Sequence, residues 1–122
     1  MKKKILIVED EKILAEMYRD KLERSGLEVY SAYDAEEGIE MIRKIKPDLV
    51  LLDILLPRQN GVGLLIQIRK EPDIASIQVL VFSNYDDLKT NREVERLGAK
   101  DYLIKTNYTP QQIVEKIKNY LE

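Results

Sequence analysis

Ile5-Leu6-Ile7-Val8 forms an uninterrupted apolar run that ends on the acidic pair Glu9-Asp10. Three later apolar runs also end on a polar or charged residue: 49–52 on Asp53, 79–82 on Ser83, and 102–104 on Lys105. Short apolar runs separated by helical stretches are typical of parallel strands buried on both faces. Because parallel strands point the same way, their carboxyl ends meet along one edge of the sheet, where open α/β sheets bind ligands. We therefore expect three carboxylates, a hydroxyl and an ammonium group to converge in one cleft.

Helical patterns fill the gaps between these runs, and residues 28–32 give one further predicted strand. Each expected helix has one apolar face. These faces run from Leu14 to Leu22, from Ile39 to Ile45, from Val62 to Ile68, from Leu88 to Leu97, and from Ile113 to Leu121. A strand followed by a helix, five times over, predicts the α/β class with a five-stranded doubly wound parallel sheet. We expect the strand order 2-1-3-4-5 of flavodoxin-like folds, in one domain covering residues 1–122.

Two helix starts and one weakly attached helix can be predicted in detail. Asp34 with Glu37 forms a capping-box pattern, and Thr109 before Pro110 is typical of an N-cap. The helix near residues 87–97 offers only three apolar anchors, namely Leu88, Val94 and Leu97. We expect it to be loosely attached to the core, as a moving element must be.

Composition limits the chemistry that this chain can perform. Its 122 residues are 44% hydrophobic and 34% charged, with a net charge of −2, so the whole molecule does not form a basic surface for nucleic acid. The lysines at positions 2–4 are expected to be a solvated start to the first strand. Because cysteine and histidine are absent, any bound metal must be a hard cation held by oxygen. The apolar opening is too short for a signal peptide or a membrane span, so we expect a cytoplasmic protein.

Asp53 is the strongest candidate for a reacting group. A carboxylate at the end of a buried strand loses hydration unless another group compensates it. Grouped with Glu9 and Asp10, it would be repelled, and a divalent cation such as Mg²⁺ would remove that repulsion. Its carboxylate can also act as a nucleophile toward a phosphoryl group. The alternatives are that Asp53 caps a turn and that Asp10 is the N-cap of the first helix.

Lys105 and Ser83 complete the predicted constellation. A flexible ammonium can pair with the acceptor carboxylate before transfer and with a phosphoryl oxygen afterwards. The Ser83 hydroxyl can donate to another phosphoryl oxygen. Taken alone, Lys105 could be a surface lysine and Ser83 a turn residue, so the set is more specific than its parts.

Over essentially its full length, the chain resembles the receiver domain of two-component response regulators. The matching pieces are Val8-Glu9-Asp10, Asp53 to Pro57 with Gly61, Ser83, Gly98-Ala99, and Asp101 to Lys105. The resemblance implies that a partner histidine kinase phosphorylates Asp53. It also implies Mg²⁺ held by Glu9 or Asp10, by Asp53 and by the backbone carbonyl of Leu55, with Ser83 and Lys105 contacting the phosphoryl group.

The resemblance further assigns Tyr102 as the switch aromatic, whereas the alternative is a residue that only packs on the sheet edge. The signal would pass to an effector protein or to a second copy of the chain, through a surface formed by the fourth helix, the last strand and the last helix. The chain would not bind nucleic acid or a membrane directly. The chain would not be a classical enzyme, and at most would slowly catalyse its own phosphorylation and dephosphorylation. Because no output domain follows Glu122, we expect either a stand-alone receiver or a fragment of a larger transcriptional regulator.

Three departures from the family pattern bear on the site. The acidic pair is Glu9-Asp10 where two aspartates are commoner, so we expect Asp10 to bind the metal directly and Glu9 to act through water. Thr106 replaces a proline that follows a cis bond, so we expect a trans Lys105-Thr106 bond and a rearranged loop. Asn84 is larger than the usual residue there and could narrow access for the phosphodonor.

Leu55 and Tyr85 occupy the family positions that flank the path of the hydrolytic water. Neither side chain supplies a general base, so we expect a long-lived phosphoryl state. Two other functions stand as alternatives. A mononucleotide binder of flavodoxin type would need a phosphate-cradling loop after the first strand, where this chain has acids. A phosphorylation-independent interaction module would leave the site silent, as Thr106 and Asn84 could allow.

Overall fold

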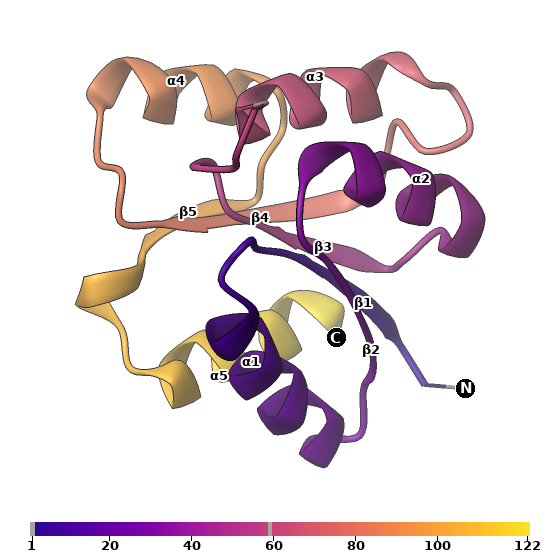
Figure 1. The fold of residues 1–122 in the computed structure, drawn as a ribbon, viewed down its shortest axis with the longest axis vertical. Helices are drawn as coiled ribbons and strands as arrows, with labels where there is room; N and C mark the ends of the chain where they lie inside the picture. Colours follow the sequence, from indigo (N-terminus) through magenta and orange to yellow (C-terminus); the bar gives the residue numbers. More distant parts are fainter. Residues whose placement is uncertain (1, 59) are drawn as a thin grey trace.

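The computed structural model describes residues 2–58 and 60–122. Five parallel strands form one sheet in the order β2-β1-β3-β4-β5 (Figure 1). The strands are β1 (Lys4–Val8), β2 (Glu28–Ala32), β3 (Leu49–Leu52), β4 (Gln78–Ser83) and β5 (Asp101–Ile104). The helices are α1 (Lys12–Arg24), α2 (Ala35–Ile45), α3 (Gly61–Lys70), α4 (Leu88–Arg96) and α5 (Pro110–Leu121), with a 3-10 turn η1 (Lys105–Asn107) after β5. The predicted fold class and strand order are confirmed.

Helices cover both faces of the sheet: α2, α3 and α4 lie on one side, and α1 and α5 on the other (Figure 1). Side chains of a strand point alternately to its two faces. In β1, Leu6 and Val8 pack toward α2–α4, while Ile5 and Ile7 pack toward α1 and α5. All four are fully buried, which explains why the run is apolar without alternation. Among the described residues, no helix has both the length and the hydrophobicity that a membrane span requires.

The predicted helix starts are confirmed, but the box predicted for Asp34 and Glu37 is incomplete, because the Glu37 side chain accepts a hydrogen bond from the Tyr33 N–H instead of the Asp34 N–H. The Asp34 side chain accepts a hydrogen bond from the Glu37 N–H at 2.8 Å, which caps α2. Thr109 and Gln112 form a reciprocal capping box at the start of α5, with Pro110 at the first helical position. These caps satisfy amide groups that a helix start would otherwise leave unpaired.

The attachment of α4 is as sparse as expected, but one predicted anchor was wrong. Val94 is buried and Leu97 packs against the same core, whereas Leu88 is 63% exposed. Val94 lies six positions after Leu88, so their side chains point about 120° apart around the helix. Leu88 therefore projects into solvent when Val94 faces the sheet.

Arg69, in the last turn of α3, ties α3 to the carboxyl end of α4. Its Nε donates to the Leu97 carbonyl at 2.6 Å, and its Nη2 donates to the Gly98 carbonyl at 3.3 Å. Its Nη1 donates to the carbonyls of Ala75 and Ile77 at 2.9 and 2.7 Å. Helix carboxyl ends leave carbonyls unpaired and favour positive charge, so Arg69 satisfies both requirements.

Replacing Arg69 by leucine should lower the free energy of unfolding by about 1–3 kcal/mol, because three partly buried carbonyls lose their charged donor. Urea denaturation measures this change. The exposed Arg92 of α4 gives a matched control: Arg92→Leu should change stability by no more than about 0.5 kcal/mol. Equal losses in the two variants would contradict the role assigned to Arg69.

Candidate functional site

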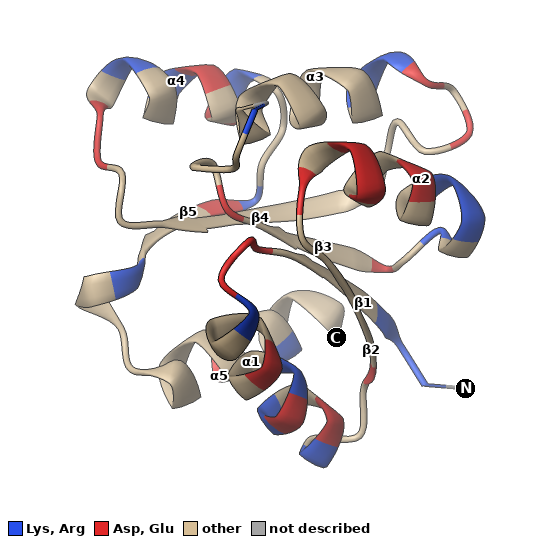
Figure 2. Ribbon diagram, viewed as in Figure 1, with Lys and Arg blue, Asp and Glu red and all other residues tan. Residues whose placement is uncertain are grey.

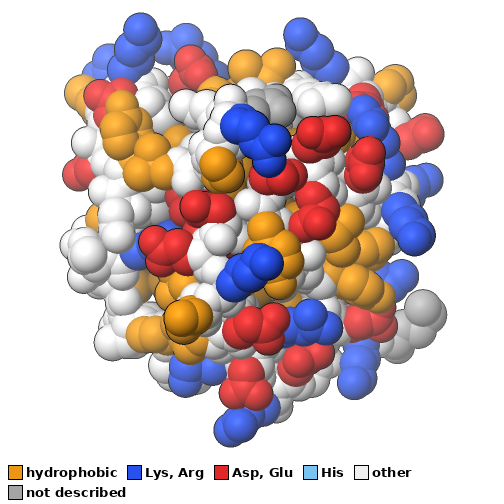
Figure 3. Space-filling view, viewed as in Figure 1, with side chains coloured by type: hydrophobic (Ala, Val, Ile, Leu, Met, Phe, Trp, Pro, Cys, Tyr) orange, Lys and Arg blue, Asp and Glu red, His pale blue; other side chains and the backbone are white. Residues whose placement is uncertain are grey.

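The strand register brings the predicted acidic residues together. Val8 pairs with Leu52 across β1 and β3, so the residues that follow them, Glu9 and Asp53, leave the sheet side by side. Carboxylate oxygens of Glu9, Asp10 and Asp53 all lie within 4.8 Å of one another. Acidic side chains gather in the middle of the face shown in Figure 3, between the two helical layers. The predicted convergence of the three carboxylates is therefore present.

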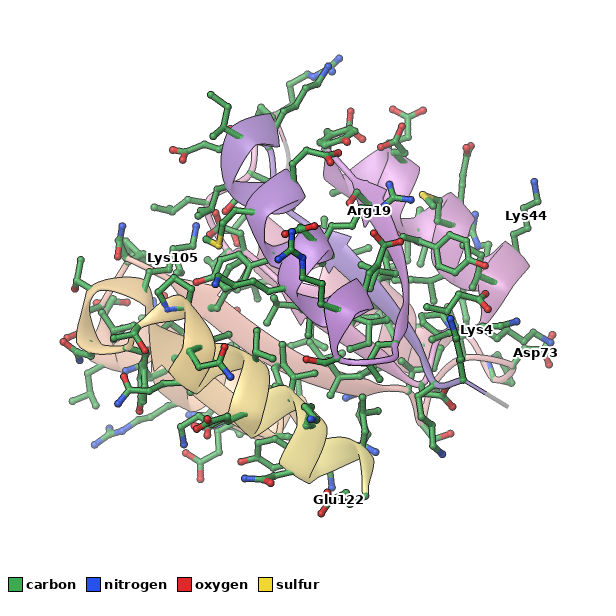
Figure 4. The ribbon with its side chains drawn as sticks, turned by 90° about the horizontal axis from the view of Figure 1, so that it is seen from below. Lys4, Arg19, Lys44, Asp73, Lys105 and Glu122 are labelled. Carbon is green, nitrogen blue, oxygen red and sulfur yellow. The ribbon has the colours of Figure 1, made fainter. Side chains whose placement is uncertain are left out.

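Lys105 reaches into this acidic cluster from the turn after β5. Its Nζ lies 2.5 Å from Glu9 Oε1 and 3.1 Å from Asp53 Oδ2. Figure 2 shows that the loop after β1 is acidic and that a basic segment follows β5. In Figure 4, Lys105 lies on the opposite side of the molecule from Lys4, which is the first residue of β1. The ammonium group thus lies at the carboxyl edge of the sheet, as predicted.

Three strand-end side chains also close the turn that follows their own strand. Each accepts a hydrogen bond from the backbone N–H two residues later: Glu9 Oε2 from Glu11 at 3.2 Å, Asp53 Oδ1 from Leu55 at 3.0 Å, and Ser83 Oγ from Tyr85 at 3.1 Å. The turn-capping alternatives for Asp53 and Ser83 are therefore correct, yet they do not compete with the site. A carboxylate has two oxygens, and Asp53 Oδ2 still faces Lys105. The alternative that Asp10 caps α1 is wrong, because the N-cap is Glu11.

Gly61, at the start of α3, packs directly against the backbone that carries Asp53. Its N–H donates to the Ile54 carbonyl at 2.8 Å. A Cβ at this position would lie 2.5 Å from the Asp53 carbonyl oxygen and 2.8 Å from the Ile54 Cα, which is closer than atoms can approach. Glycine at this position therefore lets the loop after β3 fold tightly beneath Asp53.

Burial and neighbouring charges shift the protonation of the site. Burial raises the pKa of Glu9 from 4.5 to about 7, and the charge of Asp53 acts in the same direction against the opposing effect of Lys105. Burial acts to lower the pKa of Lys105, but its hydrogen bond to Glu9 and the charge of Asp53 outweigh burial and raise that pKa. Two buried carboxylates therefore share one ammonium group, with the exposed Asp10 beside them.

The expected trans bond between Lys105 and Thr106 is confirmed. The described residues contain no cis peptide bond, so the Lys105-Thr106 bond is trans, and the chain turns through η1. The lysine nevertheless contacts both carboxylates. The ammonium group therefore reaches the acidic cluster across a trans bond and a 3-10 turn.

The remaining predicted residues lie on β5 and on the loops after β3 and β4. The Tyr102 hydroxyl donates to the Tyr85 carbonyl, which ties β5 to the loop after β4. Burial raises the pKa of Tyr102 to about 12. Asn84 is exposed, and Leu55 and Tyr85 are 51% and 40% exposed.

One contact at the site was missed by the sequence predictions. The Lys105 Nζ lies 4.6 Å from the ring centroid of Phe82, over its face. The sequence pattern assigns Phe82 only to the interior of a strand. A usable signal existed, because this residue directly precedes Ser83 and is the one phenylalanine in the sequence.

A family model described as the response regulator receiver domain matches residues 5–118. The probable transcriptional regulator ycf27 of Porphyridium aerugineum is 33% identical over 120 residues, and that of Cyanophora paradoxa is 35% identical over the same length. Each alignment covers 98% of this chain but 48% of the relative. The chain therefore spans about half the length of the curated relatives it matches.

Solved structures agree with this assignment. A putative response regulator from Chloroflexus aurantiacus is 33% identical with a TM-score of 0.88, covering 99% of this chain and 98% of that one. A CheY-like response regulator receiver domain protein from Methanospirillum hungatei is 32% identical with a TM-score of 0.90, covering 99% and 94%. The phosphorylated cyanobacterial phytochrome response regulator RcpA is 29% identical with a TM-score of 0.89, also covering 99% and 94%.

The raised Glu9 pKa predicts a specific pH dependence of stability in the metal-free protein. A carboxyl group whose pKa is higher in the folded state stabilises the fold below its unfolded pKa, and this contribution is lost as pH rises. Wild type should therefore lose about 1–3 kcal/mol between pH 4.5 and about 7. In urea denaturation with a chelator present, Glu9→Gln should reduce the change in the free energy of unfolding across this pH range. Glu16→Gln, at an exposed position on α1, should leave the pH dependence unchanged. A slope that persists in Glu9→Gln would show that another group causes it.

Proposed function

Because this chain belongs to the response regulator receiver domain family, we propose that it is a phosphorylation-controlled switch that accepts a phosphoryl group on Asp53. The main support for this proposal is the set of contacts made by the two oxygens of the Asp53 carboxylate. Its Oδ1 accepts the Leu55 N–H, while its Oδ2 faces the Lys105 ammonium at 3.1 Å. Asp53 is 4% exposed, and these two contacts hold its carboxylate in place.

Phosphoryl transfer to this carboxylate needs positioning and charge stabilisation more than covalent assistance. An Asp53 oxygen attacks the phosphorus, and the P–N bond to a histidine of the donor kinase breaks. The bonding electrons return to the imidazole, which takes up a proton. Lys105 then pairs with a phosphoryl oxygen in place of Asp53, and the Ser83 hydroxyl donates to another. RcpA, a similar protein, has been crystallised in its phosphorylated form, which supports this chemistry.

The acidic cluster fits a magnesium ion, which demands hard oxygen ligands. We assign Asp10, Asp53 and the Leu55 backbone carbonyl as direct ligands and Glu9 as a ligand acting through water. Glu9 is fully buried with one oxygen on Lys105 and the other on the Glu11 N–H, whereas Asp10 is exposed. Both Asp53 oxygens are also engaged, but Asp53 is the carboxylate that takes up the phosphoryl group, and Mg²⁺ in proteins is bound through carboxylates together with substrate phosphate. When bound, Mg²⁺ would offset the negative charge of the carboxylates and of the incoming phosphoryl group.

We place the output of the switch on α4, β5 and α5. Ser83 and Tyr102 are joined through Tyr85, since Ser83 accepts its N–H and Tyr102 donates to its carbonyl. A shift of Ser83 toward a phosphoryl group would therefore disturb the Tyr102 contact and the start of α4. The receiver would act on an effector protein or a second copy of itself, or within a larger transcriptional regulator such as the relatives it half covers.

Incubation with acetyl phosphate and Mg²⁺ tests the proposal. We expect one added phosphoryl mass on the intact protein by mass spectrometry, because Asp53 attacks phosphorus and the P–O bond to acetate breaks. Asp53→Asn should abolish the added mass, whereas Asp48→Asn, near the opposite end of the sheet, should retain it. Failure of wild type to gain the phosphoryl group, with donor and metal in excess, would instead support the phosphorylation-independent interaction module.

We expect slow loss of the phosphoryl group, because neither Leu55 nor Tyr85 supplies a general base. Replacing Leu55 and Tyr85 together by glutamine and asparagine should speed hydrolysis by about 10-fold or more, since polar groups would orient water that the native side chains do not bind. Time courses of phosphoprotein decay measure the rate. Leu88→Gln, another exposed apolar position, serves as the control and should decay like wild type. An unchanged rate in the double variant would show that these two residues do not control water access.

A further inference from the structure

Phe82 lies beneath the catalytic ammonium group at the end of β4. The Lys105 Nζ is 4.6 Å from the centroid of its ring, and the ring is completely buried. An ammonium over an aromatic face is attracted by the negative face of the ring, and the attraction strengthens when water is excluded. The Lys105 side chain is only 14% exposed, so its charge meets these conditions.

Tyr18 of α1 fixes the orientation of this ring. The two rings meet edge to face, with centroids 5.5 Å apart and planes 86° apart. Tyr18 is 3% exposed, so both rings belong to the core between the sheet and the layer of α1 and α5. The face that Phe82 presents to Lys105 is therefore held by packing, and it cannot turn away as a surface side chain could.

The backbone around Lys105 gives the lysine less support than the ring does. Lys105 begins a single 3-10 turn whose next residues, Thr106 and Asn107, are exposed. Its four-carbon side chain has several rotatable bonds, so this backbone alone does not determine where the ammonium lies. The groups that hold the ammonium are the carboxylates of Glu9 and Asp53 and the Phe82 ring.

We propose that Phe82, oriented by Tyr18, is a positioning residue that holds the Lys105 ammonium beside Asp53. The expected effect on phosphorylation rests on the proposed function. The placement of the Lys105 ammonium by the ring is independent of that function. Phe82 differs from the two carboxylates in being neutral. The attraction of the Phe82 ring for Lys105 therefore does not depend on the protonation of Glu9 and Asp53 or on other groups that these carboxylates bind. The ring also does not bind a phosphoryl group.

The sequence contains one phenylalanine, which allows an isosteric test. Biosynthetic incorporation of 3,4,5-trifluorophenylalanine changes position 82 alone and weakens the negative face of the ring while largely preserving its shape. The rate of Asp53 phosphorylation by acetyl phosphate with Mg²⁺ should fall by about 2-fold to 10-fold. In the Lys105→Met background the same fluorination should have no effect, because the charge that the ring attracts is gone. Equal slowing with and without Lys105 would overturn the proposal.

A second measurement tests the placement without phosphorylation. In the metal-free protein, NMR signals of the Lys105 ε-methylene protons should be shifted upfield by the Phe82 ring current. Phe82→Leu should remove this shift, whereas Leu80→Val, a buried change two residues earlier on the same face of β4, should retain it. Absence of the shift in wild type overturns the proposal. If the shift is present but wild type accepts no phosphoryl group, the proposed function fails while the placement stands.

Discussion

The sharing of one ammonium group by two buried carboxylates is the constraint on which the rest of the structure depends. Glu9 is fully buried and Asp53 nearly so, and ionised carboxylates in such positions are costly unless paired and hydrogen-bonded. Lys105 supplies the pairing from a strand that is distant in sequence. Correct closure of the sheet from β1 to β5 is therefore coupled to the assembly of the site, because Lys105 reaches the acids only when β5 occupies its place at the sheet edge.

The same edge connects the site to the element that we expect to move. The loop after β4 begins at Ser83 and leads into α4, and Tyr102 holds it from the neighbouring strand. At its other end α4 is fixed by the guanidinium of Arg69, which binds the Leu97 carbonyl. The carboxyl end of α4 is thus bound to α3, whereas the loop before the helix is bound to β5 through Tyr102 and the first turn is capped by Asp87.

The fold could be predicted from sequence because strands buried on both faces must be apolar throughout, and the residue that ends each run marks the site. Glu9, Asp53, Ser83 and Lys105 all follow from this rule, since each stands directly after an apolar run or closes it. Side-chain orientation around a helix is harder to predict: the sequence places Leu88 in the core because three sparse anchors do not determine one face. Which of Glu9 and Asp10 contacts Lys105 also lies beyond the sequence, since burial decides it.

Two of the three departures from the family pattern, Asn84 and Thr106, lie outside the strands, whereas Glu9, Asp53 and Ser83 stand at strand ends. Glu9, Asp53 and Ser83 each use one oxygen to close their own turn, so their positions follow from where β1, β3 and β4 end. A change of backbone at Thr106 leaves those three residues unaffected. It bears only on Lys105, and there the Phe82 ring and the two carboxylates position the ammonium by contacts to its charge. Side-chain contacts thus perform the positioning that the backbone of this loop does not provide.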